Sequence, residues 1–296
     1  MSFKGLCVMN SYSDNPNNEY KYHRLKEEFL PYGVKLDKAD ALSLLPFCYG
    51  DEIVIERLIG YDFVIYLDKD NYLAKAISGK VKMFNSYESL VLSDDKMLSI
   101  LQLEHEGVRV PLTIPAPLCY VENNSKEKEK SFLFSLEKNL GFPMVFKENH
   151  GSLGKQVKLI SSREELEKTY HEYKKIPHLY EKFLSKHSGH DFRLIVVDQK
   201  VVAVMERINE NDFRSNIALG GKGKDATDTI PESFKKMAIK ASAALKLDYA
   251  GIDIAMDDNG YPMFLEANGN AFFTEIEKVT NINIANKIVK MILKRL

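Results

Sequence analysis

The chain has 296 residues, 45% of them hydrophobic, which is enough apolar material for one large domain or about two of ordinary size. Its 41 Lys and Arg nearly balance its 42 Asp and Glu, and the formal net charge of -1 excludes binding of nucleic acid or an anionic membrane through bulk charge. No apolar run approaches the roughly 18 residues of a membrane span, and the amino terminus lacks the apolar stretch of a signal peptide. Three scattered cysteines fit neither a disulfide framework nor a zinc cluster, so we expect a cytoplasmic protein with free thiols. The sequence does not decide between a monomer and a homo-oligomer.

The first 90 residues alternate strand and helix patterns, as in an α/β unit. The run YDFVIYL from Tyr61 to Leu67 is continuously apolar, which is typical of a buried parallel strand. No GxGxxG phosphate-binding loop accompanies this pattern. We expect strands at 5–9, 61–67 and 81–84, and helices at 19–30 and 70–78.

The middle third is predicted to begin with a helix that Ser93 caps and that runs to Glu106 before Gly107. A charged loop at 122–130 leads into a helix that ends near Gly141. Strands at 144–147 and 156–160 follow, and Ser162 with Glu165 forms a capping box for a helix that runs to Lys175.

The last third is predicted to hold antiparallel sheet, because its connections are short hairpins. We expect strands at 191–197 and 201–207, a glycine-rich loop at 219–224, a helix at 231–246, a hairpin at 250–268, and helical sequence at 274–296.

The hairpin AGIDIAMDDNGYPMFLEAN carries the clearest chemical signal. If Asn259-Gly260 is a two-residue type I′ turn, Asp253 lies opposite Glu266 and Asn268 shares their face. Opposed carboxylates repel, so this placement calls for a cation, and oxygen-only ligands suit Mg²⁺. The alternative is that both acids face solvent. The other face is predicted to be core, with Ile252, Ile254, Met256, Met263 and Leu265.

Two lysines are candidates for phosphate contacts. Lys147 ends an apolar strand and precedes a loop with Gly151, Ser152 and Gly154, whose backbone N–H groups could cradle phosphate, although an ordinary hairpin turn is the alternative. Lys96 lies in a first helical turn, where a bound phosphate would offset the unfavourable helix dipole. Its alternative is an exposed lysine beside acidic neighbours.

Arginines flank the next two strands. Asp191 and Arg193 share a strand face, while Arg207 and Arg214 bracket the loop after the second strand. The planar guanidinium fork binds phosphates and carboxylates, so these residues suit an anion site. Surface ion pairs are the alternative for each arginine singly.

Taken together and in this order, these segments resemble the ATP-grasp fold, and within it the RimK-type family of ribosomal-protein glutamate ligases. The resemblance covers roughly residues 90 to 290 and rests on the segments 94–113, 141–160, 191–208, 212–223, 247–255, 265–270 and 275–289. It implies an α/β protein of the α+β ATP-grasp type. An N-terminal pre-ATP-grasp domain at 1–90 would precede two subdomains, 91–184 and 185–296, that clamp ATP.

The resemblance also implies roles for single residues. Lys96, Lys147 and the loop with Gly151, Ser152 and Gly154 would contact the nucleotide phosphates. Asp253, Glu266 and Asn268 would hold Mg²⁺, with Mn²⁺ as an alternative ion. Arg207 and Arg214 would act on the transferring group. The remaining contacts to ATP would come from Glu181, Lys182, Phe183 and Leu184 at adenine, Asp191 at ribose, and Arg214 with Asn216 at the terminal phosphate.

The implied activity is ATP-dependent ligation of a carboxylate to an amine through an acyl phosphate, with release of ADP and phosphate. Two departures from the family pattern concern the loop and the acceptor side. Gln156 stands where many relatives carry glycine, and the segment Gly269 to Phe273 replaces a common Ser-Pro-Gly continuation, which puts glutamate as the added residue in doubt. The alternatives are a small-molecule kinase and a regulatory nucleotide-binding protein on the same fold.

Overall fold

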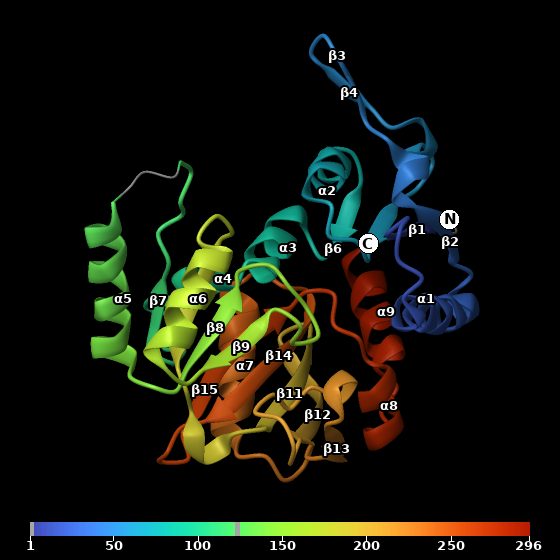
Figure 1. Cartoon of the computed structure of the whole chain (residues 1–296). Coiled ribbons are helices and arrows are strands. Elements are labelled where there is room, and N and C mark those ends of the chain that lie inside the picture. The colour runs from blue at the N-terminus through green and yellow to red at the C-terminus, as the bar shows by residue number, and fades with distance from the viewer. Residues whose placement is uncertain (1–2, 122–124) are drawn as a thin grey trace.

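The computed structural model describes residues 3–121 and 125–296, which form three larger sheets and one small hairpin (Figure 1). Residues 1–90 supply the first larger sheet, 91–184 the second and 185–296 the third. We propose that the boundaries of three domains lie at these positions. Among the described helices, none combines the length and the apolar character needed to cross a bilayer.

The first sheet is parallel and has the strand order β2-β1-β5-β6. Every residue of β5 is buried, which confirms the predicted buried strand. Helix α1 begins earlier than predicted, because the Asn15 side chain caps it and Pro16 occupies its first turn. The elements are β1 (Lys4–Met9), α1 (Pro16–Phe29), β2 (Lys35–Asp40), β5 (Phe63–Tyr66), α2 (Asn71–Ser78) and β6 (Lys82–Phe84).

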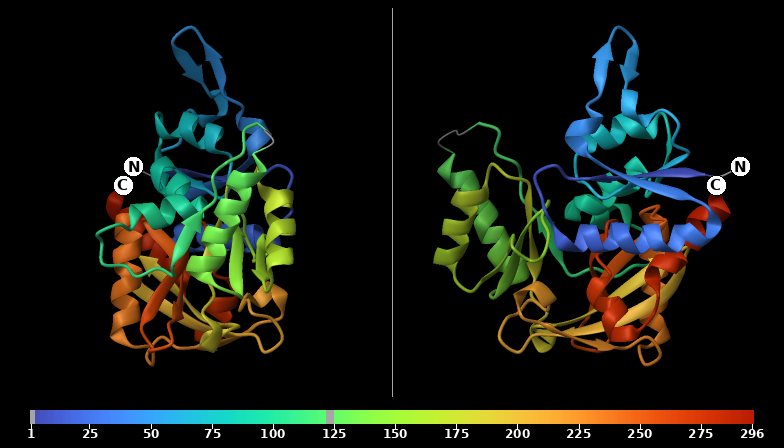
Figure 2. Two further views of the ribbon diagram at one scale, coloured as in Figure 1. Left: turned by 60° about the vertical axis from the view of Figure 1, so that its left-hand side comes forward. Right: turned by 90° about the vertical axis from the view of Figure 1, so that its right-hand side faces the viewer.

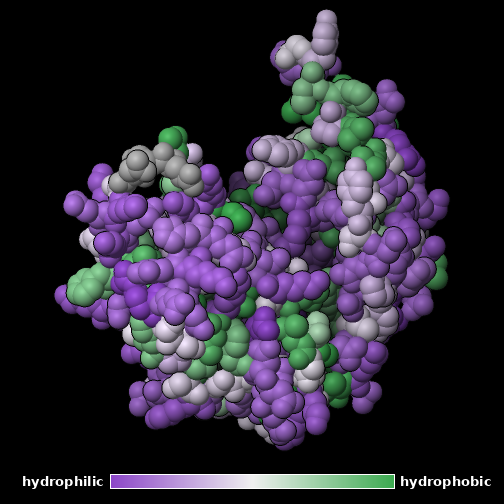
Figure 3. All heavy atoms as spheres, viewed as in Figure 1, coloured by the Kyte–Doolittle hydropathy of each residue, from purple (hydrophilic) through white to green (hydrophobic). Residues whose placement is uncertain are grey.

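A two-stranded hairpin that the sequence patterns did not predict projects from this domain. It consists of β3 (Phe47–Tyr49) and β4 (Glu52–Val54), and it stands clear of the body in Figures 1 and 2. Its strands are short and exposed along their whole length, so no alternation of buried and exposed positions marks them in the sequence. In Figure 3 the hairpin rises above a largely hydrophilic face, whose outline is notched between it and the part that carries α5 and α6.

The predicted helix from Ser93 to Glu106 is wrong, because the chain forms two short helices here. Ser93 is buried near the end of α3 (Tyr87–Asp94), where its hydroxyl donates to the Leu90 carbonyl. The cap of α4 (Lys96–Gln102) is Asp95, whose carboxylate accepts from two backbone N–H groups. Lys96 nevertheless lies in the first turn of a helix, as predicted, because it is the first residue of α4.

The second sheet is antiparallel with the order β7-β10-β8-β9. Helices α5 and α6 cover one face, where Leu136, Phe146, Leu166 and Tyr180 belong to one buried cluster. The capping box prediction is confirmed for Ser162, which accepts from the Glu165 N–H. The predicted loop at 122–130 lies partly outside the described residues. The elements are β7 (Thr113–Pro115), α5 (Lys126–Leu140), β8 (Met144–Glu148), β9 (Val157–Ile160), α6 (Arg163–Tyr173) and β10 (His178–Lys182).

The third sheet is antiparallel with the order β13-β12-β11-β14-β15. One face packs on α7, and the other packs in part on α8 and α9. The glycine-rich stretch predicted as a loop contains strand β13, because its backbone pairs with β12. The elements are β11 (His190–Val197), β12 (Lys200–Ile208), β13 (Lys222–Asp225), α7 (Glu232–Ala244), β14 (Tyr249–Met256), β15 (Pro262–Asn268), α8 (Thr274–Thr280) and α9 (Ile284–Arg295).

The hairpin of β14 and β15 confirms the predicted pairing of Asp253 with Glu266, although the predicted turn is wrong. The Asp257 N–H donates to the Tyr261 carbonyl, and the Asp257 carbonyl accepts from the Gly260 N–H. Gly260 has a φ of +81°. The connecting loop therefore has three residues instead of the predicted two. A bulge at Leu265 shifts the register back by one. The two offsets cancel. Between the turn and the bulge the register is offset by one, so Phe264 faces the core and Leu265 lines a pocket, which contradicts the predicted core position of Leu265.

The first domain shares a hydrophobic core with the third sheet. Residues of β1, α1 and β5 lie in one buried cluster with residues of β11, β12 and α9. Asn85, which follows β6, donates to the carbonyls of Tyr249 and Gly269 at 2.8 and 2.6 Å. Helix α1 lies against α8 and α9 (Figure 2). The N-terminal domain is therefore held rigidly beside the segment that follows β15.

Candidate active site

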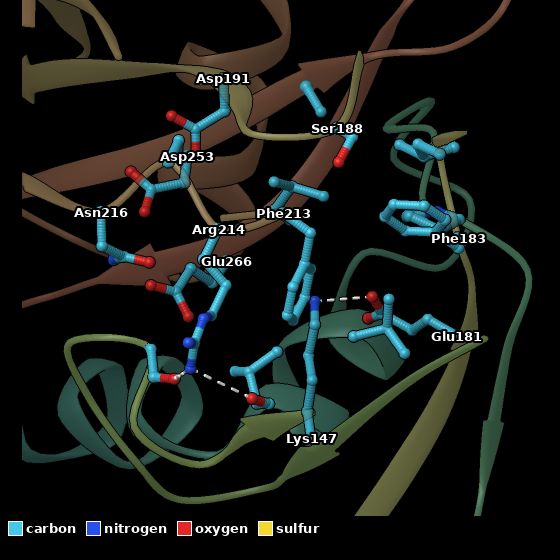
Figure 4. Close-up of a pocket in the computed structure, with 18 of the residues that line it drawn as sticks. Lys147, Glu181, Phe183, Ser188, Asp191, Phe213, Arg214, Asn216, Asp253 and Glu266 are labelled. Atoms are coloured by element: carbon cyan, nitrogen blue, oxygen red, sulfur yellow. Dashed lines mark hydrogen bonds and ion pairs between the residues drawn. The ribbon is translucent and has the colours of Figure 1, made fainter. Parts of the chain in front are cut away.

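The pleat of the second sheet directs Lys147 away from the helices. Met144 and Phe146 face α5 and α6, so the alternate residues Val145 and Lys147 face the opposite side. The Lys147 Nζ lies 2.6 Å from the Glu181 Oε2 on the neighbouring strand, and both side chains are almost fully buried. This ion pair fixes the Lys147 ammonium group in a pocket between the second and third sheets (Figure 4).

The glycine-bearing loop between β8 and β9 is held from two sides. Arg214 donates to the carbonyl of Gly154 at 2.8 Å, and the Gln156 side chain accepts from the Ser152 N–H at 3.3 Å. Gly154 has a φ of +70°, and a Cβ there would lie 2.8 Å from the Asn216 Oδ1, so the close approach requires glycine. Gln156, which stands where many relatives carry glycine, therefore adds a hydrogen bond within the loop.

Lys96 enters the same pocket from the start of α4. Its Nζ lies 3.4 Å from the Gly151 carbonyl and 3.9 Å from the Glu266 Oε2. Burial lowers the pKa of Lys96, and the nearby Lys147 lowers it further, while Glu266 opposes both effects. An anion bound between the two lysines would relieve their repulsion.

Four charged residues form a buried network on one face of the third sheet. Asp191 pairs with Arg207 through two hydrogen bonds of 2.7 and 2.6 Å. Asp253 pairs with Arg193 at 2.8 and 2.6 Å, and its Oδ2 also lies 3.0 Å from Arg207. Although burial alone would raise it, the charges of Arg193 and Arg207 hold the pKa of Asp253 at about 2. Asp253 is therefore ionised, and its charge is balanced by arginines.

The opposite end of the pocket is apolar. Phe183 and Phe213 meet edge to face with ring centroids 6.2 Å apart, and Figure 4 shows Phe183 across the pocket from Asp253 and Glu266, with Phe213 between them in the view. Val145, Ala255 and Leu265 line the same pocket. A flat aromatic base fits such a slot, while the charged end suits phosphates.

All the site residues predicted from the sequence line this pocket except Asn268. Asn268 lines a second cavity, which lies against the N-terminal domain. Lys96, Gly151, Ser152, Asn216 and Glu266 line both the pocket and this cavity. We call the first the nucleotide-side pocket and the second the substrate-side cavity.

The metal-ligand prediction can be tested against the donor set. Glu266 and Asn268 are partly exposed, and the Asn268 Nδ2 donates to the Glu266 Oε1 at 3.2 Å. Both side chains offer hard oxygen donors to a metal ion. Asp253 uses both oxygens toward arginines, but a carboxylate has about four lone-pair sites, so further coordination is open to it. Among the described residues no group of three His, Cys, Asp or Glu could hold a metal. The set fits a magnesium-type ion bound by two acids and one amide oxygen.

Comparison with known proteins settles the family. A family model described as the RimK-like ATP-grasp domain matches residues 93–292. The chain belongs to the RimK-like ATP-grasp family. It is 32% identical over 287 residues to the ribosomal protein bS6–L-glutamate ligase of Escherichia coli O81 (strain ED1a), covering 92% of this chain and 91% of that protein. It is 29% identical over 295 residues to a probable alpha-L-glutamate ligase of Sodalis glossinidius (strain morsitans), covering 94% of each.

Solved structures share the ATP-grasp fold along nearly the whole chain. A RimK domain ATP-grasp protein from Sphaerobacter thermophilus DSM 20745 superposes with a TM-score of 0.71 at 15% identity, covering 98% of this chain and 99% of that one. D-alanine–D-alanine ligase from Bacillus anthracis superposes with a TM-score of 0.72 at 18% identity, covering 99% and 97%. This RimK-like protein is an ATP-dependent carboxylate–amine ligase. The comparisons give no support to a kinase or a regulatory protein.

Sequence reasoning missed two groups of lining residues. Arg193 was placed on the same face as Asp191, but its pairing with Asp253 follows only from the register of β11 with β14. The apolar lining from Val145 and Ala255 carries no local signal, because these residues alternate with equally apolar core residues, and Phe213 lies in a loop between two charged residues.

Proposed function

We propose that this ligase activates a carboxylic acid as an acyl phosphate and transfers the acyl group to an amine. A carboxylate oxygen of the acid attacks the γ-phosphorus of ATP and ADP leaves. The amine nitrogen then attacks the acyl carbon, inorganic phosphate leaves with the former carboxylate oxygen, and the nitrogen loses a proton. The observation that carries this proposal is the junction of the nucleotide-side pocket and the substrate-side cavity at Lys96, Ser152 and Glu266.

The residues of the nucleotide-side pocket support a division of roles along ATP. Phe183 and the backbone of the segment Glu181 to Leu184 would hold adenine, and Asp191 would contact ribose. Lys147 and Lys96 would meet the phosphates under the loop from Gly151 to Gly154. Since Lys147 is already fixed by Glu181, its charge needs little reorganisation when the phosphate arrives.

Arg207, Arg214 and Asn216 would stabilise the transferring phosphoryl group. Arg214 donates hydrogen bonds to the Asp212 carboxylate and to the loop carbonyl of Gly154. A phosphate that replaced one of these acceptors would therefore link the position of the loop to nucleotide binding. No protein nucleophile is required by this chemistry.

Mg²⁺, or Mn²⁺ as an alternative, would be held by Asp253, Glu266 and Asn268, and when bound it would neutralise charge on the phosphate oxygens. The 32% identical relative is a ligase named for L-glutamate and ribosomal protein bS6. For this chain we propose an amino acid, peptide or small acid as substrates, without commitment to glutamate, because the segment Gly269 to Phe273 beside the cavity departs from the family pattern. Free thiols at Cys7, Cys48 and Cys119 support a cytoplasmic location.

The proposal is tested by measuring ADP release from MgATP with amino acids and peptides offered in pairs, followed by mass spectrometry. A new amide that forms together with ADP, and only when both acid and amine are present, is the expected result. ADP release that needs the acid and is unaffected by every amine would support phosphate transfer without ligation and would overturn the proposal.

A further inference from the structure

Two buried acceptor atoms in the wall of the substrate-side cavity have no hydrogen-bond partner. They are the Asp68 Oδ2 and the Asn18 Oδ1, and each residue is only 6% exposed. A buried polar atom without a partner costs free energy, about 1–3 kcal/mol and more for a charged group. Since both atoms are acceptors, the partner they lack is a hydrogen-bond donor.

Their position in the fold is one where α/β sheets bind ligands. The chain runs from β1 through α1 to β2 on one side, while β5 lies on the other side of β1, so the strand order reverses between β1 and β5. Asn10 follows β1, Asp68 follows β5, and the Asn10 Nδ2 donates to the Asp68 Oδ1 at 2.8 Å across this point. Ligands of open α/β sheets bind beyond the carboxyl ends of the strands at such a switch point.

The charges around the cavity favour a cationic group. Lys69 pairs with Asp94, Lys96 lies 3.9 Å from Glu266, and Arg193 is bound to Asp253, so each of these lining cations already faces a carboxylate. Asp68 has no ion-pair partner among the described residues, and its Oδ1 is satisfied by Asn10 and by the Lys69 backbone N–H. The wall of the cavity therefore holds both a carboxylate without an ion-pair partner and an amide oxygen without a donor.

We propose that the substrate-side cavity binds the acid substrate through an ammonium group held by Asp68 and Asn18. An ammonium carries three N–H donors and one positive charge, which match both orphaned acceptors. A protonated nitrogen has no free electron pair, so the group held here anchors the substrate and is not the attacking amine. The acid substrate is accordingly an amino acid or a short peptide with a free amino group. This inference rests on the proposed function.

The test separates the acid from the unknown amine by using hydroxylamine as the acceptor. Its nitrogen attacks the acyl carbon of an acyl phosphate, phosphate leaves, and a hydroxamate forms that can be measured directly. The panel holds the twenty L-amino acids, their D-enantiomers and short peptides, each beside the same acid with hydrogen or hydroxyl in place of the amino group. We expect hydroxamate from one or more amino-bearing acids and at least about tenfold lower kcat/KM for the matched acid without the amino group.

The variant Asp68→Asn keeps the size of the side chain and an oxygen for Asn10, and removes the charge. We expect it to raise the KM for the amino-bearing acid at least about tenfold while the KM for ATP changes less than twofold. Asn18→Ala should raise the same KM by a smaller factor. Asp51→Asn, in the exposed turn of the β3–β4 hairpin, is the matched control and should change neither constant.

The outcomes are distinguishable. Equal activity with acids that lack the amino group, or an unchanged KM for the amino-bearing acid in Asp68→Asn with an unaltered melting temperature, overturns the inference and leaves the ligase proposal standing. Hydroxamate from no acid of the panel, in an enzyme that binds ATP, overturns both.

Discussion

The nucleotide-side pocket and the substrate-side cavity meet at shared residues, yet they are built in opposite ways. In the pocket the charged groups satisfy one another, as in the pairs of Lys147 with Glu181 and of Arg207 with Asp191. In the cavity the walls carry asparagines and one unpaired carboxylate, and two acceptor atoms have no partner. Under our proposals the pocket is preorganised for ATP, whereas the two acceptor atoms of the cavity would be satisfied by donors of the substrate.

The two regions also come from different parts of the chain. The pocket is formed by residues 96–266, within the range that the family model matches, while the wall of the cavity includes Asn10, Asn18 and Asp68 from the N-terminal domain. The nucleotide-side pocket therefore lies within the family domain, whereas the substrate-side cavity also includes residues of the N-terminal domain, which would contact the acid under our proposal.

The largest effect is expected at the junction of the two regions. Glu266→Gln removes a charge that faces both Lys96 and the proposed ion, and we expect kcat to fall on the order of 1,000-fold with the melting temperature unchanged. Asp253→Asn should lower kcat at least as far. ADP release measures both, and Glu275→Gln, at an exposed position of helix α8, is the matched control. Retained turnover with either variant would contradict the metal assignment.

For Lys147→Met we expect weaker binding of ATP and little change in binding of the acid. The KM for ATP should rise about 10–100-fold because a preorganised phosphate contact is lost, while the KM for the acid stays within about twofold. The variant also leaves Glu181 buried without its cation, which destabilises the fold.

The double variant Lys147→Met with Glu181→Gln separates these two effects. It should recover thermal stability without recovering ATP affinity, and Lys168→Met on the exposed face of α6 serves as the control. Recovery of ATP affinity in the double variant would show that Lys147 serves only to neutralise Glu181.

A smaller effect is expected at Arg193, which lines the cavity and holds Asp253 in the pocket. Arg193→Lys keeps the charge but loses the two-pronged contact, so we expect kcat/KM for the acid to fall about tenfold with little change in the KM for ATP. Steady-state kinetics with each substrate varied in turn provides the comparison. An equal loss for both substrates would place Arg193 in the nucleotide site.

The smallest effect concerns stability behind the cavity wall. Lys21 of α1 is fully buried, its Nζ donates to the Asn270 Oδ1 at 2.7 Å, and burial lowers its pKa from 10.5 to about 7. Between these values the unfolded chain binds a proton that the folded protein does not, so the free energy of unfolding rises with pH. Between pH 7 and 8.5, the free energy of unfolding measured in urea should rise by on the order of 1 kcal/mol more in the unaltered protein than in the Lys21→Met variant. An equal gain in both proteins would mean that Lys21 keeps its proton.

Sequence patterns located most of the polar lining of the nucleotide-side pocket, because these residues lie in local motifs. Lys147 was found from a strand followed by a glycine loop, and Asp253 with Glu266 from a hairpin, although that register held only because the longer turn and the bulge at Leu265 cancel. Ser93 was mistaken for a cap because Asp95, two residues later, is an equally good one. Asp68 and Asn18 could not be found, because their placement in one cavity wall depends on the strand order β2-β1-β5-β6, which no local pattern encodes.

Transfer of oxygen from the acid to phosphate shows whether the acid is activated as an acyl phosphate. The acid substrate is labelled with ¹⁸O in its carboxylate, and the inorganic phosphate released during ligation is analysed by mass spectrometry. If the carboxylate attacks the γ-phosphorus, one ¹⁸O atom appears in the phosphate for each amide formed. Amide formation with release of unlabelled phosphate would contradict activation through an acyl phosphate.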